Sequence, residues 1–99
     1  MTDAALSAAA EQERREECRA AVLAFLAPRQ ATAHHPQSIR RRLAAGHEHD
    51  FSLDEITAAL AFLESAGLVR GLADALGATR YYQITAAGVL AHERRPPTS

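Results

Sequence analysis

The chain has a single cysteine, no lysine and no long apolar run among its 99 residues. One cysteine, Cys18, excludes an intrachain disulfide and is typical of proteins from a reducing cytoplasm. The lack of any stretch of about 18 apolar residues argues against a membrane span. The segment Met1–Ala5 has neither the basic start nor the apolar core of a signal peptide. We therefore expect a cytoplasmic protein that does not associate with membranes.

The sequence also lacks an excess of positive charge and any recognisable catalytic pattern. Its 11 basic residues are all arginine and are balanced by 12 acidic residues, which gives a net charge of −1. The overall charge therefore does not indicate a nucleic-acid partner, although it does not exclude a local basic patch. Serine, histidine and aspartate are present, but no spacing or strained turn identifies a nucleophile. We expect neither an enzyme nor a cofactor.

The composition that remains is rich in alanine and suits one small helical domain. Hydrophobic residues make up 47% of the chain, and 23 of them are alanine. The larger apolar residues are too few for a sandwich or a ligand-enclosing barrel, and a chain of this length forms one domain. We expect residues 1–21 to form an N-terminal helical arm and residues 22–94 to form the domain. Residues 95–99 are predicted to be a disordered tail, because consecutive prolines cannot continue a helix.

The first two helices are predicted by composition and by proline and glycine. The stretch Ala4–Ala27 lacks both residue types and ends before Pro28. An apolar stripe at helical spacing is formed by Cys18, Ala21, Val22, Phe25 and Leu26. The charged segment Glu11–Arg19 is either a solvated face or an arm that awaits a partner. Pro36 suits the first position of a short second helix that ends at about Ala45, before Gly46.

The third helix has the clearest signals in the chain. Ser52 and Glu55 match a capping box, and Phe51 and Ile56 are placed to form a hydrophobic staple. We expect this helix to run to about Ala66 and to end at Gly67. The residues predicted to face inward are Leu53, Ile56, Leu60 and Leu63.

The last third of the chain changes pattern. We expect strands at Leu68–Ala73 and Ala78–Thr85, joined by the turn Asp74–Gly77, because apolar and polar residues alternate in the second strand. Thr85 is placed to cap a last helix over Ala86–Arg94. The predicted order is helix, helix, helix, hairpin, helix, which is a mostly α fold with a small β-hairpin.

This order, together with two short motifs, resembles the winged helix-turn-helix. The motifs are Leu53-x-x-Ile56-x-x-x-Leu60-x-x-Leu63-x-x-x-Gly67-Leu68-Val69-Arg70 and Tyr82-x-Ile84-Thr85-x-x-Gly88. They are similar to those of small regulators of the MarR, PadR and ArsR type. The resemblance implies a DNA-binding transcription regulator with double-stranded DNA as its partner. It also implies that Ser52–Ala66 is the recognition helix, Pro36–Ala45 its supporting helix and Leu68–Thr85 the wing.

Two functional hypotheses follow from the charges on these elements. The recognition helix holds Asp54, Glu55 and Glu64 and no basic residue, whereas DNA contacts normally rely on arginine and lysine. In the first hypothesis the protein binds DNA through Arg40, Arg41, Arg42, Thr57, Ser65, Arg70 and Arg80. In the second, the helix is a docking or dimerisation surface for a protein, centred on Asp54, Ala58, Ala61 and Phe62.

Three further features have both an ordinary and a functional interpretation. The histidines of His34–His35 and His47–His49, with adjacent acids, suit a metal, but a polar loop is the simpler interpretation and we expect no metal site. Cys18 fits either a small buried hydrophobe or a redox pair across a dimer. We also expect a homodimer through the first and last helices, because the long first helix has more apolar face than one small core covers.

Overall fold

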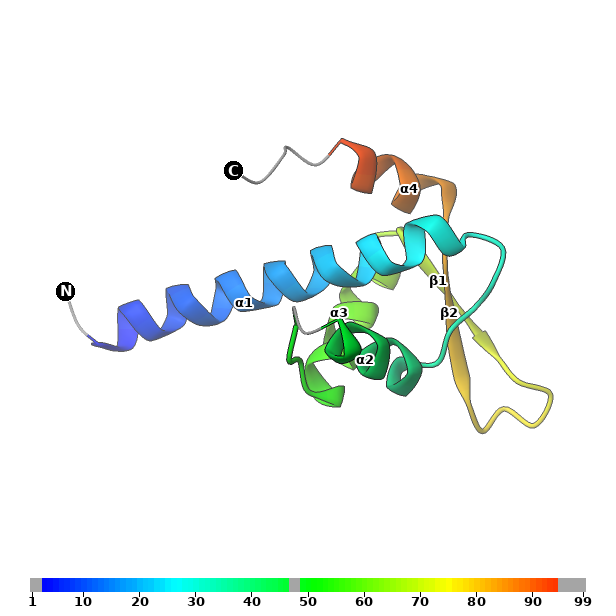
Figure 1. Cartoon of the computed structure of the whole chain (residues 1–99), viewed down its shortest axis with the longest axis horizontal. Coiled ribbons are helices and arrows are strands. Elements are labelled where there is room, and N and C mark those ends of the chain that lie inside the picture. The colour runs from blue at the N-terminus through cyan, green and yellow to red at the C-terminus, as the bar shows by residue number, and fades with distance from the viewer. Residues whose placement is uncertain (1–2, 47–48, 95–99) are drawn as a thin grey trace.

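The computed structural model describes residues 3–46 and 49–94 (Figure 1). Its elements are α1 (Asp3–Leu26), the short 3-10 helix η1 (Ala27–Arg29), α2 (Pro36–Ala45), α3 (Leu53–Ser65), β1 (Val69–Ala73), β2 (Arg80–Ile84) and α4 (Ala86–Glu93). This order confirms the predicted succession of three helices, a hairpin and a helix. The predicted tail at residues 95–99 lies outside the described residues.

The long helix α1 has two halves with different surroundings. Every residue from Asp3 to Glu17 is exposed, and Cys18 is the first buried one. The N-terminal half projects beyond the rest of the molecule, while the C-terminal half lies between α4 on one side and α2 and α3 on the other (Figure 1). The predicted apolar stripe is buried in full, since Val22 and Leu26 are wholly inaccessible to solvent. None of the described helices is long and apolar enough to cross a membrane.

Local capping fixes where α2 and α3 begin. Pro36 is the first residue of α2, and the Nδ1 atom of His35 accepts a hydrogen bond from the Gln37 amide. At α3 the predicted capping box is present. The Ser52 hydroxyl accepts from the Glu55 amide at 3.1 Å, and the Glu55 carboxylate accepts from the Ser52 amide at 2.9 Å. The starts of both helices are therefore set by residues close in sequence.

The end of α3 leads directly into the wing. Gly67 has φ of +77°, and the amides of Gly67 and Leu68 donate to the carbonyls of Glu64 and Leu63, which is a Schellman closure. Strands β1 and β2 pair antiparallel, with Val69 opposite Ile84. In addition to this two-stranded sheet, a single-residue antiparallel β-bridge joins His34 to Tyr82 on the other edge of β2. The sequence patterns did not predict this bridge.

The contacts of Thr85 and Gly88 explain why these two residues occur at the start of α4. The Thr85 hydroxyl accepts from the Gly88 amide and donates to the Gly67 carbonyl, so one side chain caps α4 and ties it to the end of α3. A Cβ atom at Gly88 would lie 2.1 Å from the Leu68 carbonyl oxygen. Only glycine lets α4 approach the start of the wing this closely.

One buried cluster unites α1, α2, α3 and the wing. Its largest fully buried members are Leu26, Ile39, Ile56, Leu60, Leu63, Val22 and Val69. The expectation that Leu53 faces inward is wrong, because its side chain is 41% exposed. Leu53 is the first residue of α3, and the helix turns its apolar face to the core only from Ile56 onward.

Candidate nucleic-acid interface

The exposed side of α3 carries small residues, one acid and one aromatic ring. Thr57, Ala58, Ala61 and Ser65 are all exposed, as predicted, and so is Asp54. Phe62 is 48% exposed. No ion pair involves Asp54 among the residues that the structure describes. This side of the helix therefore offers two hydroxyls and several small side chains to a partner, beside one aromatic ring.

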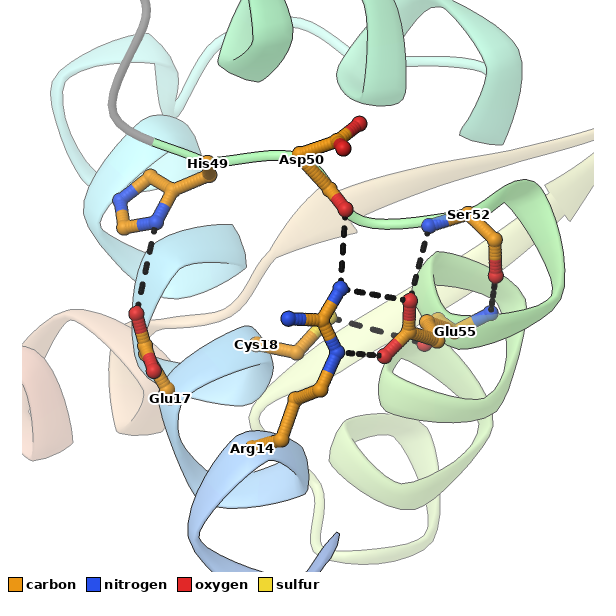
Figure 2. Close-up of polar contacts among 7 residues, drawn as sticks. All are labelled: Arg14, Glu17, Cys18, His49, Asp50, Ser52 and Glu55. Carbon is orange, nitrogen blue, oxygen red and sulfur yellow. Dashed lines mark hydrogen bonds and ion pairs between the residues drawn. The ribbon is translucent and has the colours of Figure 1, made fainter. Parts of the chain in front are cut away.

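The N-terminal end of α3 is held by an arginine from the exposed half of α1. Arg14 donates from Nε and Nη2 to the two carboxylate oxygens of Glu55, at 2.5 and 3.0 Å, and from Nη2 to the Asp50 carbonyl at 2.8 Å (Figure 2). Its guanidinium also lies 5.0 Å from the centre of the Phe51 ring. Bidentate pairing of this kind fixes geometry as well as charge. The recognition helix and the α1 arm are thus directly connected.

Glu55 serves two partners with one carboxylate. Its pKa is lowered from 4.5 to about 2, first by the hydrogen bond from Arg14 and then by that from the Ser52 amide. The charge of Glu55 is therefore offset by Arg14 and by the helix N-terminus. It adds little negative potential to the outer face of α3.

The C-terminal end of α3 is held in the same way by the wing. The Arg80 guanidinium forms an ion pair with Glu64, and the same carboxylate oxygen accepts from the Gly71 amide at 3.2 Å. The pKa of Arg80 is raised, chiefly by the hydrogen bond to Glu64. Two of the three acids on the recognition helix, Glu55 and Glu64, are thus offset by arginines from other elements. Asp54 alone is not.

The three arginines of α2 point in different directions. Consecutive helical residues are about 100° apart, and the contacts follow this divergence. Arg40 is half-buried and donates to the Gln37 side chain at 3.0 Å, whereas Arg41 is exposed. Arg42 lies 5.8 Å from the Phe25 ring centre. The three arginines therefore have different neighbours, and their role in a phosphate-binding patch stays a prediction.

Arg42 lies in a basic cluster around the Phe25 ring. We call it the Phe25 cluster, and its members are Phe25, Arg29, His34 and Arg42. The Arg29 guanidinium lies 4.2 Å from the Phe25 ring centre and donates to the Phe25 carbonyl at 2.7 Å. His34 meets the same ring edge-on at 5.3 Å. Burial, followed by the charges of Arg29 and Arg42, lowers the pKa of His34. Among the described residues no ion pair offsets either arginine.

The two faces of the wing differ. Tyr82 and Ile84 are buried, and their neighbours Tyr81 and Gln83 face out, as predicted. Arg70 lies opposite Gln83 and donates to its side chain at 2.8 and 3.2 Å. The turn carries Leu76, which is 91% exposed, and no arginine. The outer wing face is therefore partly apolar.

The alternative docking residues border a groove between α1 and α3 of about 320 Å³. Asp54 and Ala58 line this groove, together with arginines of α1. Phe62 is 48% exposed, but the Arg19 guanidinium covers its ring at 3.5 Å from the centre. Ala61 is exposed. The four residues thus lie on one helix, although α1 already covers part of their surface.

With this geometry described, comparisons with known proteins identify the fold. Solved structures similar to the chain include MepR, a transcription regulator of the Staphylococcus aureus multidrug efflux pump MepA. It matches at 16% sequence identity with a TM-score of 0.61, over 94% of this chain and 73% of MepR. Two mutants of MepR match at 16% and 17% identity with a TM-score of 0.62, over 94% of this chain and 72% of theirs. The chain folds as a winged helix-turn-helix. A scan of protein-family models and a search among curated proteins each found no match.

The predicted fold is therefore confirmed. In it α3 occupies the position that the sequence resemblance assigns to a recognition helix, α2 that of the supporting helix and β1–β2 that of the wing. The residues at the two ends of α3 that sequence reasoning missed are Arg14 and Arg19. The same reasoning passed over Arg29, which follows Pro28 in an unpatterned stretch. Each of these three arginines contacts an aromatic ring or a carboxylate distant in sequence. None of them has a local sequence signal.

The remaining candidates of the sequence have structural partners. The His34 Nε2 atom lies 2.9 Å from the Thr32 hydroxyl, and His35 caps α2. His47 lies outside the described residues, and within them no three potential ligands are grouped to hold a metal. Cys18 is 2% exposed, and burial raises the pKa of its thiol to about 11. These values favour the interpretation of Cys18 as a buried hydrophobe, because the thiolate is the reactive form.

Proposed function

We propose that this protein is a small winged-helix transcription regulator that binds double-stranded DNA. The observation that carries the proposal is the state of the recognition helix. Its formal charge of −3 counts against DNA, but Glu55 and Glu64 are both offset by arginines. The outer face of the helix then presents hydroxyls and small side chains suited to close approach in the major groove. A regulator of this kind works in the cytoplasm, where its DNA is accessible.

Within this proposal the arginines supply phosphate contacts and the hydroxyls supply base contacts. Arg41 is exposed and carries no ion pair among the described residues, so it is the first candidate on α2. Arg40 and Arg70 donate to glutamine side chains, and Arg42 lies near the Phe25 ring. A phosphate readily replaces such neutral partners. Thr57 and Ser65 lie on the exposed face of α3. Such a division, with arginine for position and small polar residues for sequence, is the usual one.

The test is fluorescence anisotropy with a labelled duplex of mixed sequence over a salt series. Binding is expected at low salt and should weaken as salt rises, by about 0.9 in the slope of log affinity against log salt for each phosphate contact. Replacing Arg41 with glutamine should reduce this slope by about one contact. Replacing Arg15, which is bonded to Gln12 on the α1 arm, is the matched control. Absence of binding at low salt would refute the proposal.

We also propose that the regulator is a homodimer through α1 and α4. The support is the exposed half of α1, where Leu6 is 57% exposed, and the outer side of α4, where Leu90 is 48% exposed. A helix that projects into solvent over several turns gains stability mainly by packing its apolar side. Sedimentation equilibrium should give twice the chain mass at micromolar concentration, and Leu6→Glu should shift the equilibrium toward monomer. A monomer at high micromolar concentration would refute this part.

A second candidate function is a protein-docking module without DNA binding. It is favoured by exposed large apolar residues on α3 and the wing, which include Leu53, Phe62, Leu72 and Leu76 at 40–91% exposure. Exposed apolar patches on a folded domain mark interaction sites. The anisotropy experiment separates the two functions, since a docking module gives no salt-dependent DNA binding.

A further inference from the structure

One carboxylate joins the recognition helix to the wing. Glu64 lies in the last turn of α3, pairs with Arg80 at the start of β2, and accepts a hydrogen bond from the Gly71 amide of β1. Both side chains remain in contact with water, since Arg80 is 51% and Glu64 33% exposed. The pair therefore lies at the surface, in the angle between the recognition helix and the wing.

The wing is shaped to let Arg80 lie down against α3. Gly71 occupies β1 on the same sheet face as Arg80, and a Cβ atom there would lie 2.4 Å from the Arg80 Nε atom. The residue directly opposite Arg80 is the small Ala73. The Arg80 side chain thus crosses β1 where no side chain obstructs it. A small residue opposite Arg80 and a carboxylate beyond it complete the site.

From these contacts we infer that Glu64 withholds Arg80 from DNA and thereby limits the affinity of the winged helix for phosphates. The inference rests on the proposed function and concerns its regulation. Release of Arg80 to a phosphate would leave the Glu64 carboxylate unpaired beside that phosphate, and this repulsion opposes binding. Arg80 therefore stays with Glu64 in the wild-type protein, although the partly exposed pair is itself weak. Glu64 is in this sense a positioning residue for Arg80.

Glu55 and Asp54 show that this property is specific to Glu64. Glu55 completes the capping box of α3, so its pairing with Arg14 stabilises the start of the helix. Asp54 has the same charge on the same helix but no ion pair among the described residues. Of the acids that the structure describes, Glu64 is the one paired with an arginine of the wing. Removing its charge therefore releases a cation, whereas removing that of Asp54 only reduces repulsion.

The experiment compares E64Q with wild type by anisotropy, using the same mixed-sequence duplex over a salt series. We expect E64Q to bind about fivefold more tightly at moderate salt and to steepen the salt slope by about 0.9, the value for one added phosphate contact. The matched control D54N should bind more tightly without that increase in slope. The double variant E64Q/R80Q should return the slope to that of wild type, and R80Q alone should leave it unchanged.

A second variant displaces Arg80 without removing the Glu64 charge. Gly71→Ala places a methyl group where the Arg80 side chain crosses β1, and its backbone has no positive φ that alanine would strain. The salt slope should rise as in E64Q, but the gain in affinity should be smaller because the Glu64 carboxylate remains. Circular dichroism of both variants checks that they fold.

The outcomes separate the inference from the proposed function. If wild type binds DNA and E64Q has the same slope, or binds more weakly than wild type, Glu64 does not withhold Arg80 and the inference is overturned while the function stands. If only E64Q binds at low salt, Glu64 withholds Arg80 but the proposed DNA binding by the wild-type protein is refuted. If no variant binds at low salt, the proposed function is refuted and the inference with it.

Discussion

Glu55 offers the sharpest test of how the α1 arm supports the recognition helix. We expect Glu55→Gln to destabilise the protein at neutral pH, because glutamine still accepts from the Ser52 amide but no longer carries the charge that Arg14 binds. The substitution thus separates the ion pair from the capping box. Arg14 is left with one neutral acceptor and the Asp50 carbonyl.

The size of the effect follows from the pKa of Glu55. A fall from 4.5 to about 2 corresponds to at most about 3.4 kcal/mol, at about 1.36 kcal/mol per pH unit. The Glu55 side chain is 34% exposed, and solvent screening reduces the contribution to about 1–2 kcal/mol. For a domain of this size that loss lowers the melting temperature by about 5–10 °C.

The destabilisation by E55Q should depend on pH in a characteristic way. The pKa of Glu55 is lower in the folded state than in the unfolded state. Its stabilisation is therefore complete above about pH 4.5 and is lost as the pH falls toward 2. The stability difference between wild type and E55Q, from urea unfolding at several pH values, should shrink over that window. It should be close to zero near pH 2.

Asp54→Asn is the matched control for this experiment. Asp54 also lies in the first turn of α3 and shares the favourable interaction with the helix N-terminus, but it has no arginine partner among the described residues. Equal destabilisation by E55Q and D54N would refute the argument. So would a difference between wild type and E55Q that stays constant from pH 7 to pH 2.

Three further predictions concern packing and reactivity. Gly88→Ala should destabilise the protein by about 1–3 kcal/mol in urea unfolding, because its Cβ would lie 2.1 Å from the Leu68 carbonyl oxygen; an unchanged midpoint would contradict this. Gly46→Ala, with a helical φ of −75° and a new Cβ at an ordinary 3.6 Å from the Leu43 carbonyl oxygen, should instead stabilise by about 0.4–1 kcal/mol, and a loss comparable to that of G88A would be the wrong sign. Cys18 should react with a thiol reagent only after unfolding, because burial raises its pKa to about 11; rapid labelling of the native protein would show that the thiol is accessible.

The fold was predictable because the residues that begin and end its helices act through local contacts. Pro36 starts α2, Ser52 and Glu55 start α3, and Gly67 ends it, each through contacts within a few residues. Such signals act on the chain before any tertiary contact forms. The motif from Thr85 to Gly88 is also short, so the start of α4 was readable as well. Helix and strand bounds consequently match to within two residues.

The connections around α3 were not predictable because their partners are distant in sequence. Arg14 and Glu55 are 41 residues apart, and Arg80 and Glu64 are 16 apart. Each pair forms only because packing of the core brings two helices, or a helix and a strand, side by side. Periodicity identifies which residues face the core, but it does not say which charged residues meet across two exposed flanks.

The charge of the recognition helix shows why this distinction matters for function. Counted along the sequence, α3 has three acids and no base, which disfavours DNA. Counted on the folded surface, Arg14 and Arg80 offset two of the acids, but both arginines are then engaged. On the supporting helix and wing, within the part of the chain that the structure describes, the exposed arginines without a carboxylate partner are Arg41, Arg42 and Arg70. Arg40 has none either, but it is half-buried and so contributes less to a salt slope.

Three phosphate contacts give a salt slope of about 2.7 for one chain and about 5.4 for a symmetric dimer. A slope near the lower value leaves the affinity of a single winged helix weak at physiological salt, since non-specific binding depends on the number of phosphates neutralised. Useful DNA binding by so few free arginines therefore requires either the dimer proposed through α1 and α4 or the release of Arg80 from Glu64. The two routes are distinguishable, because dimerisation doubles the slope whereas E64Q adds about one contact per chain.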